Sequence, residues 1–135
     1  MQSLIRTLVG LGLGSLSLLA VAATPLAYIV LPADGAVVKS PVTVVFGLRK
    51  PWGVAPAGVA MEKTGHHHLL VDAPLPDLSK PVPNDAQHLH FGAGQTETTL
   101  ELAPGKHTLQ LLLGDYAHLP QQPPIFSEVI TITVE

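Results

Sequence analysis

The chain reads YIVLPADGAVVKSPVTVVFGL over residues 28–48, and this stretch decides the fold class. Val, Ile, Tyr and Phe favour extended backbone, so residues 28–31 and 42–48 are predicted to form two strands. Between them, Pro-Ala-Asp-Gly at residues 32–35 is typical of a turn, and Val37 and Val38 make a short strand continuation. The opening of the fold is therefore two short strands joined across a tight turn.

The rest of the chain repeats this alternation of short strands and turns, with no sustained helical period. Residues 103–106, Ala-Pro-Gly-Lys, have the length and composition of a hairpin connection between two of the later strands. Those later strands are predicted at residues 66–72, 96–102, 107–113 and 128–134, with residues 88–91 as a short strand or an ordered loop.

Six or seven short strands in one chain predict an all-β fold, an immunoglobulin-like β-sandwich, with a small open barrel as the alternative. Two proline-rich loops, residues 49–64 and 73–87, are longer than such a sandwich needs. Long ordered loops tend to carry function, so both loops are candidates for the functional region.

The N-terminal residues are predicted to form a secretory signal peptide. Arg6 precedes an apolar run over residues 8–21, and Ala-Val-Ala at residues 20–22 suits cleavage. An uncleaved membrane anchor is the alternative, which the shortness of the run and its three glycines disfavour. We therefore expect a signal peptide over residues 1–23, a single β-sandwich domain over residues 24–135, a periplasmic or secreted location and no stable membrane insertion after cleavage.

The composition excludes several classes of function. The chain has 135 residues, seven histidines and no cysteine, which rules out disulfides and the usual thiolate-bound blue-copper and iron–sulfur sites. Its net charge is −3, with ten acidic and seven basic residues, so nucleic acid is not a plausible partner.

Four segments carry all seven histidines: GHHHLLVD at residues 65–72, HLHFGAGQTE at 88–97, PGKHTLQL at 104–111 and GDYAH at 114–118. Together they resemble the bacterial secreted family DUF4399, a domain of unknown function. The resemblance implies an exported β domain in which these histidines belong to the shared motifs. It implies no activity, so the chemistry must be argued from the residues.

Two groups of closely spaced histidines, at residues 66–68 and 88–90, predict a metal site. Side chains two apart on an extended strand share a face, so His66 pairs with His68, and His88 pairs with His90. Imidazole is the commonest protein ligand for metals, and two such pairs side by side would offer up to four nitrogens to one ion. Relative affinity favours copper for this set, whereas tetrahedral ligation would favour zinc.

The other three histidines are weaker candidates. His118 lies in a loop and is predicted to be an additional or capping ligand, while His67 and His107 are less favoured. We expect His66 and His68 to face solvent and His67 to be partly buried with a hydrogen bond to backbone. His107 opens a strand, where a histidine commonly bonds a neighbouring loop.

Three aspartates, Asp72, Asp85 and Asp115, lie a few residues from a histidine. A carboxylate at such a position can accept the second ring N–H of a metal-binding imidazole and fix its tautomer. Each aspartate is also an ordinary turn former.

The leading functional hypothesis is a periplasmic, histidine-rich carrier, buffer or accessory protein for copper, with zinc as the alternative ion. The second is an immunoglobulin-like interaction or assembly module, which would bind another envelope protein and use its histidines structurally. Catalysis is disfavoured, because no Gly-x-Ser-x-Gly or comparable nucleophile motif occurs.

Overall fold

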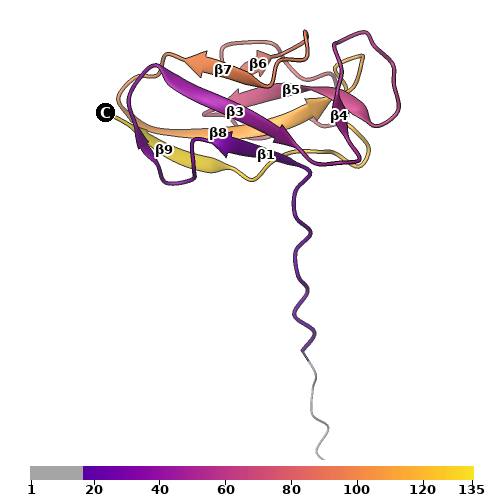
Figure 1. Ribbon diagram of the computed structural model, residues 1–135, viewed down its shortest axis with the longest axis horizontal. Helices are drawn as coiled ribbons and strands as arrows, with labels where there is room; N and C mark the ends of the chain where they lie inside the picture. The colour runs from indigo at the N-terminus through magenta and orange to yellow at the C-terminus, as the bar shows by residue number, and fades with distance from the viewer. Residues whose placement is uncertain (1–16) are drawn as a thin grey trace, which may run out of the picture.

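The computed structural model describes residues 17–135, and residues 1–16 of the predicted signal peptide lie outside this range. Two β-sheets stack face to face in the described part of the chain, which confirms the all-β sandwich (Figure 1). Among residues 17–135, no helix is long and apolar enough to span a membrane. The strands are β1 (Ala27–Leu31), β2 (Val37–Val38), β3 (Val42–Leu48), β4 (Gly53–Val54), β5 (Thr64–Val71), β6 (His88–His90), β7 (Glu97–Leu100), β8 (Gly105–Gly114) and β9 (Ile130–Val134).

The strand order is that of an immunoglobulin-like sandwich. One sheet has the order β1-β3-β7, and the other has the order β2-β9-β8-β5-β4, with β6 also paired to β5. The chain changes sheets between β1 and β2, and β2 pairs in parallel with the last strand, β9. The turn at this change is held by Asp34, whose carboxylate accepts the Thr131 N–H at 2.8 Å, and by Gly35, which has a φ of 80°.

Alternating side chains of both sheets form the core. From β3 it contains Val42, Val44 and Phe46, and from β8 it contains Leu109, Leu111 and Leu113. Every second residue of each strand thus points between the sheets, as a two-residue period requires.

The hairpin predicted around residues 103–106 is wrong. β7 pairs with β3 in one sheet, whereas β8 pairs with β5 and β9 in the other. The connection between β7 and β8 therefore crosses from one sheet to the other. The predicted loop over residues 49–64 also contains β4, which adds a short parallel pairing to β5.

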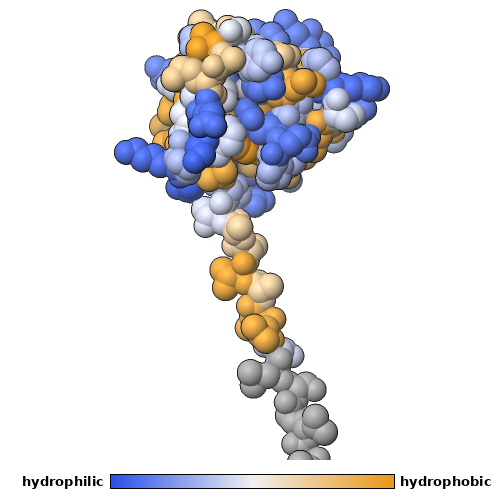
Figure 2. Space-filling view, turned by 90° about the vertical axis from the view of Figure 1, so that its right-hand side faces the viewer, coloured by the Kyte–Doolittle hydropathy of each residue, from blue (hydrophilic) through white to orange (hydrophobic). Residues whose placement is uncertain are grey.

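The segment before β1 leaves the sandwich as an extended chain (Figure 1). Its surface is largely apolar (Figure 2), and Leu18, Leu19 and Val21 are about nine-tenths exposed. The first residues that contact the core are Leu26 and Ala27.

Candidate metal centre

Strand β5 brings three consecutive histidines into the protein interior. It is paired on both edges, with β8 on one side and β4 and β6 on the other, and residues 65–71 are all buried. Leu69 and Val71 belong to the core between the sheets, and His67 lies on the same side, with its ring centre 5.2 Å from that of Phe46. His66 and His68 therefore share the opposite face with Leu70, as the alternation predicted.

The expectation that His66 and His68 face solvent is wrong, because they are 0% and 1% exposed. The outer face of β5 is covered by the proline-rich loop of residues 73–87, which packs Val82 against Leu70 and Leu112. The same loop is tied to residues 115–119 by a hydrogen bond of 2.8 Å from the Val82 N–H to the His118 carbonyl. The loop of residues 73–87 therefore buries a face of the sheet that would otherwise be exposed to solvent.

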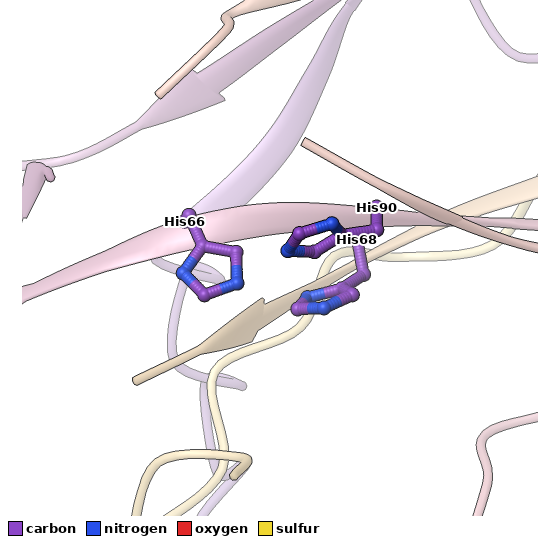
Figure 3. A group of neighbouring side chains, drawn as sticks. All are labelled: His66, His68 and His90. Atoms are coloured by element: carbon purple, nitrogen blue, oxygen red, sulfur yellow. The ribbon is translucent and has the colours of Figure 1, made fainter. Parts of the chain in front are cut away.

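The antiparallel pairing of β5 and β6 places His90 directly opposite His68. His66, His68 and His90 each offer one ring nitrogen, and these three atoms lie within 4.8 Å of one another. Figure 3 shows the three rings gathered together beside β5. This group of three histidines could hold a metal ion.

A fourth imidazole comes from the loop after β8. The Nε2 atom of His118 lies 3.1 Å from Nε2 of His90. Asp115 forms the turn that positions it, since its carboxylate accepts the N–H groups of Ala117 at 2.8 Å and Leu119 at 2.9 Å. His118 has a φ of 67°, which is unusual for a residue with a side chain and is maintained only where the surroundings hold it.

The other histidines lie apart from this group. His88 donates Nδ1–H to Asp85 at 2.8 Å. His107 donates to the Asp72 carboxylate and to the Ala103 carbonyl, each at 2.7 Å, which confirms its prediction as a strand-end residue bonded to a loop.

Asp85 and Asp72, two of the three aspartates noted in the sequence, thus each bond a histidine. Neither of these histidines belongs to the group of His66, His68 and His90. Asp115 instead bonds the backbone of its own turn. The predicted backbone hydrogen bond of His67 is wrong, because neither of its ring nitrogens has a partner.

Residues 44–135 match the family described as Domain of unknown function (DUF4399). The chain belongs to the DUF4399 family. The matched range includes all seven histidines, and it confirms the resemblance seen in the four histidine-bearing segments. No curated protein and no solved structure matches the chain. The function of this DUF4399 domain must therefore be inferred from its own residues.

The buried imidazoles of this DUF4399 domain are held in the neutral form. Burial, together with the nearby His90 and His118, lowers the pKa of His66 to about 4. Burial, together with His66, His90 and His118, lowers the pKa of His68 to about 3. Burial and His118 also lower the pKa of His90. Since a neutral imidazole is the form that binds a metal, these rings are ready to bind one at neutral pH.

Several of these ring nitrogens have no partner within the protein. Both nitrogens of His66 and Nδ1 of His68 are shielded from solvent without a hydrogen bond. A buried polar atom left in this state costs about 1–3 kcal/mol, and such atoms are rare in native proteins. Binding an ion would give each of these two rings a partner.

A cavity of about 290 Å³ lies beside the rings. Its walls are formed by His68, Pro81, Val82, Asn84, His90 and His118. The half-buried His90 and His118 therefore connect the buried His68 to a space from which an ion can enter.

Two glycines, which were not predicted from the sequence to belong to the site, leave room for the rings. A Cβ atom on Gly92 would lie 2.3 Å from Cε1 of His90, and one on Gly114 would lie 2.7 Å from Cε1 of His68. Gly92 belongs to the segment HLHFG and Gly114 to the segment GDYAH, both of which contain histidines. Their closeness to histidines in the sequence is the signal that could have identified these two glycines.

The Gly92→Ala variant should therefore displace the His90 ring and weaken metal binding while the fold is kept. The added methyl group meets the end of a half-buried side chain that can rotate away, so the sandwich need not adjust. We expect a loss of at least about tenfold in affinity, because even residues that only orient metal ligands contribute about 10- to 100-fold. Metal titration followed by calorimetry measures this loss.

Gly53→Ala is the matched control, since a Cβ atom at Gly53 would have nothing within 4 Å. Equal affinities for the two variants would show that the position of the His90 ring does not matter for metal binding.

Proposed function

We propose that this DUF4399 protein binds one transition metal ion in the bacterial cell envelope, as a carrier, buffer or accessory factor. The observation that carries the proposal is the convergence of the buried His66 and His68 with the half-buried His90, together with the ring nitrogens of His66 and His68 that have no partner within the protein. By affinity alone copper is the leading ion, because it binds nitrogen ligands most tightly among the divalent metals, and zinc is the alternative that tetrahedral ligation would favour.

A purely structural role for the histidines agrees less well with these contacts. A histidine network that stabilises loops should satisfy its ring nitrogens with hydrogen bonds, as His107 does with Asp72 and Ala103. Within residues 17–135, the only hydrogen bond between two rings of the cluster joins His90 and His118. His67 lacks hydrogen-bond partners too, so a bound ion is supported by the missing partners of His66 and His68 in combination with the convergence of these two rings on His90.

The periplasm or the medium is the proposed location, because the N-terminal residues have the pattern of a secretory signal peptide. A metal carrier there would exchange its ion with another envelope protein, through the side of the site that the cavity leaves accessible.

Metal content tests the proposal. The untagged protein, exported to a periplasm and purified without chelators, should contain close to one copper or zinc ion per chain by mass spectrometry. His90→Ala should lose the ion, because it removes one of the three convergent nitrogens.

His88→Ala is the control, since His88 lies on the same strand and bonds Asp85 instead. Absence of metal from the wild-type protein, with no uptake of added copper or zinc, would refute metal binding and favour the interaction module.

A further inference from the structure

The rings of four histidines lie close together, and the distances between their centres indicate which coordination geometry they could give an ion. These histidines are His66, His68, His90 and His118. The ring centres of His66 lie 4.9 Å from His68, 5.0 Å from His90 and 5.0 Å from His118. The ring centres of His68 and His90 are 5.2 Å apart, and those of His90 and His118 are 4.8 Å apart. Only the pair His68 and His118 is wider, at 6.2 Å.

These separations can be compared with those that an ion would impose. With metal–nitrogen bonds of about 2.0–2.1 Å, each ring centre lies about 3.2 Å from the ion. Four rings in a regular tetrahedron then have all six separations near about 5.2 Å. In a square plane, four separations are about 4.5 Å and two, between opposite rings, are about 6.4 Å.

Five of the six observed separations agree with the tetrahedron. A planar site needs two opposite pairs at the long distance, and if His68 and His118 are one such pair, His66 and His90 must be the other. Their ring centres are only 5.0 Å apart. We therefore infer, on the basis of the proposed function, that His66, His68, His90 and His118 together bind one ion as a flattened tetrahedron suited to Zn(II) or Cu(I).

The nitrogens of His90 and His118, which form a hydrogen bond with each other, also lie at a distance that fits a shared ion. Two nitrogens bound to one ion lie about 2.9 Å apart at a right angle and about 3.4 Å apart at the tetrahedral angle. The observed separation of 3.1 Å falls between these values. The nitrogens of His66, His68 and His90, now within 4.8 Å, can approach further by rotation of the rings, because the ring torsion of histidine is broad.

The backbone around the site opposes a change to planar geometry. Two ligands lie on the doubly paired strand β5, one lies on β6, and His118 is held in its turn by Asp115. Cu(II) prefers square-planar or tetragonal ligation, whereas Zn(II) and Cu(I) have filled d shells and no such preference. Four protein ligands also occupy all the coordination positions of a tetrahedral ion. Sites without an open position are typical of proteins that hold a metal, whereas catalytic sites keep one position open.

Cobalt(II) is the probe for this inference, because its visible absorption reports coordination number. The metal-free protein with Co(II) should develop the intense bands of four-coordinate cobalt, and His118→Ala should change those bands and weaken binding at least about tenfold. His118→Gln, which keeps a polar side chain on the turn, should show the same change. His88→Ala should leave the bands as they are.

Weak bands typical of five- or six-coordinate cobalt would overturn the tetrahedral assignment, and unchanged bands in both His118 variants would overturn the role of His118. Neither result affects metal binding itself, whereas failure to bind Co(II), Zn(II) and copper would refute the proposed function as well. Competition with chelators specific for Zn(II) or Cu(I) then identifies the ion. A tetragonal paramagnetic resonance spectrum of the Cu(II)-loaded protein would also contradict the inference.

Discussion

Zinc(II) or copper(I), added to the metal-free protein at about a thousand times its Kd, is expected to raise the free energy of unfolding by about 4 kcal/mol. The proposed ligands come from β5, β6 and the loop at residues 115–119, so the folded chain brings them together and the unfolded chain does not. For a domain of this length, the corresponding rise in Tm is roughly 15 °C. Thermal unfolding followed by circular dichroism, with and without the ion, measures it.

Variants separate this effect from unspecific binding. His90→Ala should show little of the rise, because one of the convergent nitrogens is lost. His88→Ala should show all of it, since His88 lies outside the group and bonds Asp85. If His90→Ala gained as much stability as the wild type, the ion would bind somewhere else on the protein.

The metal-free protein is expected to lose stability steeply as the pH falls below about 6.5. In the folded state, burial lowers the pKa of His66 and His67 to about 4 and that of His68 to about 3. In the unfolded chain these histidines have their ordinary value near 6.5. Between these limits the unfolded state takes up protons that the folded state does not, so acid favours unfolding.

The expected slope is large because three buried groups act together. Each contributes up to about 1.4 kcal/mol per pH unit, which makes about 4 kcal/mol per pH unit for the three. From pH 6.5 to pH 4 the loss would reach about 10 kcal/mol, which is comparable with the whole stability of an ordinary domain, about 5–15 kcal/mol. Hydrogen bonding to Asp72 raises the pKa of His107. A raised pKa in the folded state adds stability that is fully present below the unfolded pKa of about 6.5, so His107 does not change the slope in that range.

Urea unfolding between pH 5 and pH 7 tests this expectation, with His67→Leu as the matched variant. The substitution leaves intact the face of β5 that carries His66 and His68, because His67 lies on the opposite face beside Phe46. It should reduce the slope by about one third and stabilise the protein at neutral pH, since an apolar group replaces an imidazole without partners. An unchanged slope would show that His67 is not held neutral in the core.

Much of the fold was predictable because strands leave a local pattern. The runs at residues 28–31 and 42–48 became β1 and β3, and the predicted strand at residues 66–72 became β5. Which strands pair was harder to predict, as the failed hairpin at residues 103–106 shows. Pairing depends on contacts between residues far apart in the chain, and a turn sequence does not specify which sheet the next strand joins.

The sequence by itself determined that the chain is a histidine-rich β-sandwich and that His66 and His68 share one face, because side-chain direction follows from the two-residue period of a strand. Only the tertiary structure decided that this face is buried, through the packing of Val82 in the loop of residues 73–87. The tertiary structure also decided that His118 joins His90, whereas His88 and His107 bond aspartates. The physical reason is that burial and convergence arise from long-range packing and pairing, which no local repeat encodes.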